Sequence, residues 1–297
     1  MCIYYVMKMW IQDTITFVIL ALLLPFVSTL LIKGNTVTLY EKAQTETEDE
    51  AYVEACFSAL QLPDGNDEFL KAMAVILRSR LQSDPKILPV YSQIPQAHIR
   101  SQQSWLAYAK RMKDAVKETK GEVIVYQNKV IYPPYHLVSA SVTRDASDLL
   151  DKQNIPYLKS VESMIDQHSE EYCHTFFYSW EEVNKKFDLE FTEGFEYKET
   201  LSEQIKIKKS SQKNYVASVE IGEFEVTGDR LRELFDLPSI SFELFLSEEG
   251  MRIVTYGVGH GLGMSLYGAQ QMAEKGMDYQ TILKYFYPET EIKVLSE

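Results

Sequence analysis

The chain has 297 residues, of which 45% are apolar, so it is long enough to bury a sizeable core in one large or two small domains. Its 43 acidic and 30 basic side chains give a formal net charge of −13, which argues against binding nucleic acid through general electrostatics. Three cysteines are too few to imply a disulfide framework.

The first feature in chain order is the apolar run Thr14–Ile32, which contains no charged side chain. As a helix it is about long enough to cross the core of a bilayer. Only Lys8 precedes it and no small-residue cleavage site follows, so an uncleaved single-pass anchor is favoured over a signal peptide. We predict a stub and transmembrane anchor over residues 1–33, a polar tether over 34–47, and a folded domain over 48–297.

Helix and strand patterns are mixed in the folded domain. Residues 54–82 carry two helical patterns, separated by a breaker in which Asp64 and Asn66 can cap the second helix. Residues 172–200 have weak periodicity and are not assigned. The absence of a regular βαβ rhythm predicts an α+β fold with antiparallel strands. In chain order, the other predicted elements are a helix over 102–117, a hairpin over 122–132 with its turn at Gln127–Asn128, strands within 215–227 and 240–256, a helix ending near 275 and a helix over 278–285.

The most distinctive segment is Gly257–Ala269, which begins with glycine at every second position as far as Gly263. It lacks the Lys-Ser/Thr of a phosphate-binding P-loop and no βαβ unit follows, which argues against a nucleotide site. Alternate glycines leave one backbone face open to a sugar or to a neighbouring strand, with His260 on the opposite face. His260 can therefore bond either to a substrate or within the fold.

The sequence Gly-His-Gly-Leu-Gly-Met-Ser-Leu-Tyr-Gly-Ala over 259–269 resembles the signature Gly-His-Gly-Val-Gly-Met-Ser-Gln-Tyr-Gly-Ala of the sporulation stage II protein D (SpoIID) and amidase-enhancer family. The resemblance covers about residues 48–292. Other segments follow in the family's order, namely Leu70–Val75 with Arg78, Ala115–Val123, Pro156–Val161, residues 228–242 and Tyr279–Pro288.

In sporulating bacteria a member of this family is a lytic transglycosylase, which cleaves peptidoglycan glycan strands and helps the mother-cell membrane to engulf the forespore. The resemblance implies a sporulation protein of the bacterial cell membrane with its domain on the outer side. The implied partners are glycan strands, a sporulation amidase and a membrane partner. No cofactor is implied. No metal site is predicted either, since His98 is isolated and the cluster of His168, Cys173 and His174 lacks a fourth ligand.

The family reaction needs a carboxylic acid that protonates the leaving oxygen and then accepts the muramyl hydroxyl proton. The resemblance assigns this acid to a Glu-Met-Pro motif, and alignment on Pro63 places Gln61 at the acid's position. Ungapped counting from Leu70 gives Leu60 instead. Neither residue can transfer a proton as a carboxylic acid does. Glu54 or Glu68, both close in sequence to Gln61, is a candidate substitute acid. Each also has an ordinary explanation, Glu54 as a solvated helix charge and Glu68 as a first-turn residue favoured by the helix dipole.

A second family segment, His-Ser-Thr-Ser-Gly-Gly-x-Thr, corresponds to residues 136–143, where Ala140 and Ser141 replace the two glycines. Leu266 likewise replaces the glutamine of the signature. These departures leave open a non-catalytic alternative, a glycan-binding scaffold or an activator of a partner cell-wall amidase. The resemblance implies a substrate site formed by His136, Ser139, Thr143, Gly259, His260, Gly261 and Ser265.

Overall fold

The structure is a computed structural model that describes residues 50, 53–54, 56–57, 65–83, 102–148, 155–190, 205–209, 214–222 and 224–295. The predicted anchor Thr14–Ile32 and the tether lie outside these residues. In the described part of the chain, no helix has both the length and the apolar character needed to cross a membrane. The chain divides into two compact units, Met1–Ala55 and Cys56–Glu297, and the helices and strands named below belong to the second.

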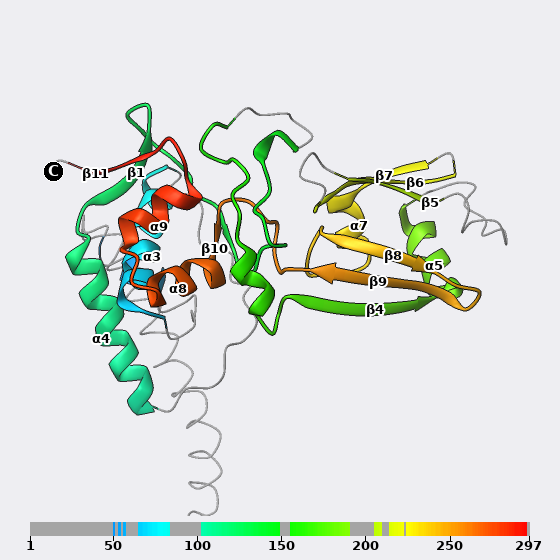
Figure 1. Ribbon diagram of the computed structural model, residues 1–297, viewed down its shortest axis with the longest axis horizontal. Helices are drawn as coiled ribbons and strands as arrows, with labels where there is room; N and C mark the ends of the chain where they lie inside the picture. Colours follow the sequence, from blue (N-terminus) through cyan, green and yellow to red (C-terminus); the bar gives the residue numbers. More distant parts are fainter. Residues whose placement is uncertain are drawn as a thin grey trace, which may run out of the picture. The chain divides into compact units, whose positions relative to one another are not determined.

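The second unit has an α+β fold, which confirms the predicted class (Figure 1). Within the residues that the structure describes, its strands form four small sheets with the orders β11-β1-β2, β10-β3, β4-β9-β8 and β5-β6-β7. All pairs are antiparallel except that of β10 with β3. The strands are β1 (Glu122–Tyr126), β2 (Lys129–Val130), β3 (Tyr135–His136), β4 (Cys173–Ser179), β5 (Ile205–Lys209), β6 (Val216–Ile221), β7 (Phe224–Thr227), β8 (Phe242–Leu246), β9 (Gly250–Tyr256), β10 (Met264–Ser265) and β11 (Glu291–Val294).

Helix α3 is the centre of the first core. Its apolar side chains are almost fully buried, and it packs against α4, β1, α8 and α9. Asn66 caps it, since its side-chain oxygen accepts a hydrogen bond from the backbone of Glu68 at 2.9 Å, as predicted. The buried Arg78 donates to the carbonyl oxygens of Glu122 and Val116 and so joins α3 to its neighbours. The helices are α3 (Asp67–Ser83), α4 (Gln102–Glu118), α5 (Trp180–Glu190), α7 (Gly228–Leu234), α8 (Leu266–Glu274) and α9 (Tyr279–Phe286), with short 3-10 turns η2 (Ala146–Asp148) and η3 (Met164–His168).

The predicted hairpin is confirmed. Its strands β1 and β2 pair through Val125 and Val130, and the two turn residues, Gln127 and Asn128, have φ values of 50° and 62°. Two consecutive left-handed residues are typical of a type I′ turn, whose backbone twist matches that of the two strands it connects. The hairpin is only part of its sheet, because β1 also pairs along its other edge with β11 at the end of the chain.

The unassigned stretch 172–200 contributes strand β4 and helix α5. Strand β4 pairs along its whole length with β9. Its side chains alternate between half-buried and exposed, and Phe177 is 51% exposed. Because neither face of the strand is fully buried, its sequence lacks a strong apolar alternation. The following helix places Trp180, Val183 and Phe187 in a second core. That core is completed by apolar side chains of β6, β7, α7, β8 and β9, and Figure 1 shows these elements gathered around α5.

Candidate functional site

The site begins where two distant segments of the chain pair. The glycine loop, residues 257–263, lies along residues 134–144. Val258 donates to the carbonyl of Val138 at 2.7 Å, and Arg144 donates to the carbonyl of Gly261 at 2.7 Å. Strand β10 then pairs in parallel with β3. The pairing therefore brings together the two family segments that the sequence singled out.

The glycines of the loop are required by this pairing. Gly261 and Gly263 have φ values of +76° and +69°, in the left-handed region that favours glycine. A Cβ atom at Gly261 would lie 2.7 Å from the ring of Tyr215, and one at Gly263 would lie 2.0 Å from the carbonyl oxygen of Pro134. Other parts of the chain thus cover the backbone face that the glycines leave open. Of the two alternatives from the sequence, a sugar or a neighbouring strand, the structure shows neighbouring protein at this face.

Two histidines share the backbone of Leu262. The Nδ1 atom of His136 lies 3.1 Å from the carbonyl oxygen of Leu262, and the backbone N–H of Leu262 donates to Nδ1 of His260 at 3.0 Å. A carbonyl can only accept, so His136 carries its proton on Nδ1 and leaves Nε2 as an acceptor. His260 accepts at Nδ1 and so carries its proton on Nε2. The ring centroids are 5.9 Å apart.

Both imidazoles are held neutral. His136 is 4% exposed, and burial, followed by the nearby His260, lowers its pKa to about 3. Burial also lowers the pKa of His260 to about 4, assisted by Arg232, Arg80 and Arg144. The buried Nε2 of His136 has no hydrogen-bond partner among the residues that the structure describes. The pair therefore presents one acceptor and one donor at neutral pH.

Arg144 connects the loop to helix α7. Its side chain is 5% exposed and forms a two-pronged ion pair with Asp229, with Nη2–Oδ2 at 2.9 Å and Nη1–Oδ1 at 3.3 Å. Asp229 lies in the first turn of α7, where the helix dipole favours a carboxylate. Its charge acts on His260 in the opposite direction to the arginines and raises the histidine pKa.

Two further guanidinium groups act on His260. Arg232 donates Nε–H to the carbonyl of Leu237 at 3.1 Å, and burial lowers its pKa. Arg80, near the end of α3, lies over the rings of Tyr132 and Tyr135 at 4.5 and 4.8 Å from their centroids. We call the set of Arg80, Arg144, Arg232, His136 and His260 the arginine–histidine cluster. Its arginines give it positive charge, partly balanced by Asp229.

Three of the predicted substrate residues are almost fully buried and have partners within the protein. The backbone N–H of Ser139 donates to Asp166 at 2.7 Å, and the hydroxyl of Thr143 accepts from the backbone of Val161 at 2.9 Å. Ser265 caps α8 by accepting from the backbone N–H of its third following residue, at 3.1 Å. These contacts explain the residue types structurally. Their contact with a substrate, like that of Gly259 and Gly261, stays a prediction.

The buried Asp166 was not found by sequence reasoning. Its side chain has no exposed surface, and burial raises its pKa, while the hydrogen bond from Ser139 acts in the opposite direction. Gly268 packs on it, since a Cβ there would lie 3.1 Å from Oδ1 of Asp166. Asp166 therefore links η3 to Ser139, in the segment after β3, and packs against α8. No periodic or motif signal surrounds it in the sequence.

The candidate acids are not brought together with the cluster by any described contact. Gln61 lies outside the described residues. Glu68 binds Lys71 through Oε1 at 2.9 Å and accepts from the backbone N–H of Tyr279 through Oε2 at 3.0 Å. Both carboxylate oxygens thus have internal partners, and they fasten the start of α3 to the start of α9.

The histidines outside the cluster have ordinary contacts. His168 bonds to the carbonyl of Ile165, and His174 lies 3.1 Å from the carboxylate of Glu171. Cys173 is an exposed free thiol. Within the described ranges, no group of three or more His, Cys, Asp or Glu side chains is arranged to hold a metal ion. His98 lies outside those ranges.

Comparison with known proteins agrees with the signature. The family model for SpoIID, described as stage II sporulation protein, matches residues 38–126. Stage II sporulation protein D of Bacillus subtilis (strain 168) and that of Bacillus amyloliquefaciens are each 30% identical over 215 residues, which cover 72% of this chain and 60% of theirs. The amidase enhancer of Bacillus subtilis is 59% identical over 34 residues, 11% of this chain and 5% of its own.

The fold and the paired signature segments thus define a protein of the sporulation-protein and amidase-enhancer class. More specifically, the chain belongs to the SpoIID family as a divergent member. It spans about 60% of the length of the two Bacillus relatives.

The packing of the glycine loop can be tested with two matched substitutions. We expect Gly263→Ala to lower the free energy of unfolding by about 3 kcal/mol or more, because it adds a backbone clash to the cost of a left-handed residue. Gly276 also has a left-handed φ, +87°, but a Cβ added there would meet no atom within 4 Å. Gly276→Ala should therefore lower the free energy of unfolding by only about 1 kcal/mol. Urea unfolding of both variants measures the difference. Equal costs would contradict the contact with Pro134.

The buried histidine predicts a pH dependence of stability. The folded pKa of His136, about 3, lies below the ordinary value of 6.5, so the unfolded chain binds more protons between these values. Stability is therefore complete above about pH 6.5 and is lost as pH falls through that window. From pH 7 to pH 5 the contribution of His136 should decrease by roughly 2 kcal/mol.

We expect His136→Asn to unfold in urea with a smaller pH dependence than the natural protein over pH 5–7. The exposed His168 supplies the control, since His168→Asn should keep the natural dependence. A His136 variant whose stability changes with pH as steeply as that of the natural protein would show that this imidazole is not held neutral.

Proposed function

We propose that the protein is a sporulation protein that binds peptidoglycan glycan strands through the arginine–histidine cluster. The family membership and the names of the Bacillus relatives support a role in sporulation. The observation that carries the binding proposal is the positive cluster with an unpartnered buried histidine acceptor. The muramyl sugar of a peptide-stripped strand carries a lactyl carboxylate, which an arginine can bind through paired hydrogen bonds.

The charge of the whole chain makes this cluster selective. A net charge of −13 opposes long polyanions, whereas a local group of arginines can still attract one carboxylate at short range. The neutral histidines add an acceptor and a donor of the kind that hydroxyl and acetamido groups need. A sugar acid combines the groups that these side chains can bind.

Binding without cleavage is the form of the proposal that the contacts support best. Proton transfer needs a carboxylic acid close to the scissile bond. Glu68 is engaged with Lys71 and Tyr279, and the position aligned with the family acid is Gln61. We therefore propose a glycan-binding scaffold or an activator of a partner cell-wall amidase. Lytic transglycosylase activity is the second candidate, supported by the family alone.

The proposal includes the location and partners that the resemblance implies. The apolar run Thr14–Ile32 would anchor the protein in the bacterial cell membrane, with the folded domain on the outer side, where glycan strands lie during engulfment. A sporulation amidase and a membrane partner would act with it. The short match to an amidase enhancer supports the amidase.

Recognition of the carboxylate can be tested by sedimentation with insoluble peptide-stripped glycan. We expect the full-length protein to bind this glycan and to bind at least about tenfold more weakly when the muramyl carboxylates are reduced to alcohols. Arg232→Gln should weaken binding to the natural glycan by a similar factor. Arg230→Gln, on the same helix but paired with Glu233 on the surface, should bind like the natural protein. Equal binding to both glycans would contradict carboxylate recognition.

Cleavage is tested by incubating the protein with the same glycan and searching for anhydromuramyl products by mass spectrometry. We expect none from the natural protein, whereas Gln61→Glu should produce them, because it places a carboxylic acid at the position aligned with the family acid. Glu118→Gln is a structural control for Glu68→Gln, because both carboxylates bind Lys71. Products that disappear in Glu68→Gln but persist in Glu118→Gln would establish catalysis and overturn the non-catalytic form.

A further inference from the structure

Helix α4 carries a line of lysines along its exposed side. Lys110, Lys113 and Lys117 follow one another at spacings of three and four residues, which places them above one another on the helix. Lys120 continues this spacing in the turn after the helix. All four residues are exposed, whereas the opposite side of α4 is buried and packs against α3 (Figure 1). We call these four residues the lysine stripe.

The positive charges of the stripe are largely unmatched. The ammonium groups of Lys110, Lys113 and Lys117 form neither an ion pair nor a hydrogen bond with any residue that the structure describes. The exposed Asp114 lies beside them on the helix and offsets one charge. The helix dipole favours lysines in the last turn and so accounts for Lys117, but Lys110 and Lys113 lie before that turn. The stripe thus gathers positive charge on a chain whose formal net charge is −13.

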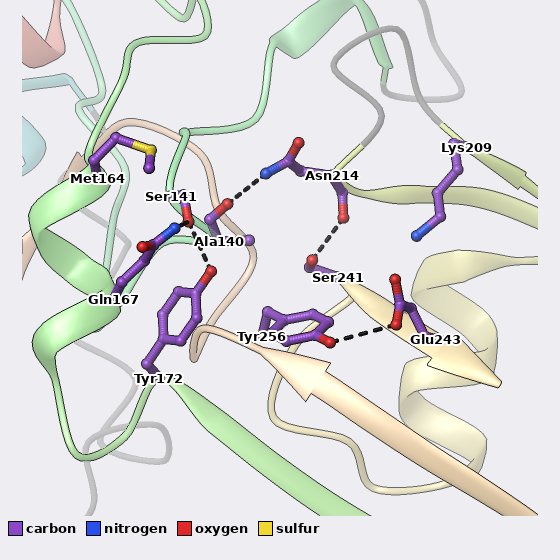
Figure 2. A pocket seen from close by; sticks show the side chains of 10 residues that line it. All are labelled: Ala140, Ser141, Met164, Gln167, Tyr172, Lys209, Asn214, Ser241, Glu243 and Tyr256. Atoms are coloured by element: carbon purple, nitrogen blue, oxygen red, sulfur yellow. Dashed lines mark hydrogen bonds between the residues drawn. The ribbon is translucent and has the colours of Figure 1, made fainter. Parts of the chain in front are cut away.

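A pocket in the same unit has balanced charges by comparison. Its volume is about 390 Å³, and in Figure 2 Lys209 and Glu243 lie at one end of it. Ser141, Tyr172 and Tyr256 belong to the rest of its lining. One lysine and one glutamate leave this lining without net charge. The lysine stripe has no such balance, so a partner that binds it has to supply negative charges.

Exposed apolar side chains adjoin the end of the stripe. Gly121 follows Lys120, and its carbonyl accepts a hydrogen bond from the backbone N–H of Leu295 at 2.9 Å. A Cβ atom at Gly121 would lie 3.3 Å from Cγ1 of Val294. The side chain of Val294 is 68% exposed and that of Leu295 is 37% exposed. Positive charge and exposed aliphatic groups therefore meet at one place, as they do in protein surfaces that lie on anionic bilayers.

The proposed function places a bilayer close to this surface. The apolar run Thr14–Ile32 would anchor the chain, and residues 33–49 join it to Glu50, the first residue that the structure describes. Even fully extended, these residues span at most about 60 Å. Such a tether gives the bilayer a high effective concentration at the folded domain, so weak contacts are enough for docking. A soluble polyanion has no such advantage and is repelled by the net charge of −13.

We propose that the lysine stripe, with Val294 and Leu295, docks the folded domain on anionic lipid headgroups of the bilayer that holds the anchor. The inference rests on the anchor in the proposed function and adds a defined orientation of the domain to it. Lysines near an anionic bilayer are attracted through their charge, and aliphatic side chains enter the boundary between headgroups and acyl chains. An acidic protein surface matches the lysines alone, whereas a bilayer matches both the lysines and the exposed aliphatic pair.

The test measures how fast acetic anhydride acetylates each lysine of the full-length protein in lipid nanodiscs, with peptide mass spectrometry as the readout. One set of nanodiscs contains phosphatidylcholine and the other contains phosphatidylglycerol. We expect phosphatidylglycerol to slow the acetylation of Lys113 and Lys117 at least about fivefold relative to phosphatidylcholine. Salt at about 0.5 M should remove most of this protection, because it screens the charges. Lys185, an exposed lysine of α5, is the matched control and should react equally in both.

Substitutions on the stripe test the surface itself. In a variant with both Lys113→Glu and Lys117→Glu, phosphatidylglycerol should no longer protect Lys110, since two attractive charges are replaced by two repulsive ones. Lys185→Glu should leave the protection of Lys110 unchanged. Val294→Ser should reduce it about twofold, because less apolar surface enters the bilayer. A double variant that keeps the natural protection of Lys110 would overturn the assignment.

The docking surface and the anchor fail differently. A chain that inserts into both kinds of nanodisc, but whose stripe is not protected by phosphatidylglycerol, would overturn the docking surface and leave the anchor standing. A chain that enters neither kind would overturn the anchor and, with it, the docking surface. Equal protection by both lipids would overturn the recognition of anionic headgroups. Protection by soluble polyglutamate as strong as that by phosphatidylglycerol would also overturn it, in favour of an acidic protein partner.

Discussion

The backbone of Leu262 is the contact on which the site depends. Its carbonyl accepts from His136 and its N–H donates to His260, so one peptide unit selects the tautomers of both histidines. This arrangement requires residues 134–144 and 257–263 to lie within hydrogen-bonding distance of each other along their lengths. The left-handed glycines permit that approach, because a side chain at Gly257 or Gly263 would collide with the backbone of the opposing segment, at Val138 or Pro134. The signature glycines are thus required for packing. By allowing the close approach, they also allow Leu262 to fix the tautomers of His136 and His260.

Two chemically different environments lie along the same segment. His136, at its start, belongs to a buried positive cluster in which desolvation keeps imidazoles neutral beside permanently charged guanidinium groups. Ser141, five residues later, belongs to an open pocket with aromatic rings and balanced charges. The 136–143 segment therefore contributes to both environments.

The divergence of this chain from the family signature has a physical consequence at Ser141. The backbone at Ser141 has the left-handed conformation that glycine favours, and the serine hydroxyl is hydrogen-bonded on two sides. At Glu68, in contrast, a carboxylate close in sequence to the expected acid is committed to holding α3 against α9. Proximity in sequence did not make it available for chemistry.

The sequence by itself determined the local elements and the family. Alternation and turn residues predicted the β1–β2 hairpin, the Asn66 cap predicted the start of α3, and the glycine signature predicted the segments that meet at the site, because these depend on neighbouring residues. Only the tertiary structure decided which strands pair and which side chains contact one another. Strand β4 is half-exposed and is defined by pairing with β9 rather than by its own pattern. Arg80, Arg144, Asp166, Glu243 and Tyr256 come from separate elements, and their roles arise from burial and proximity, which no local pattern records.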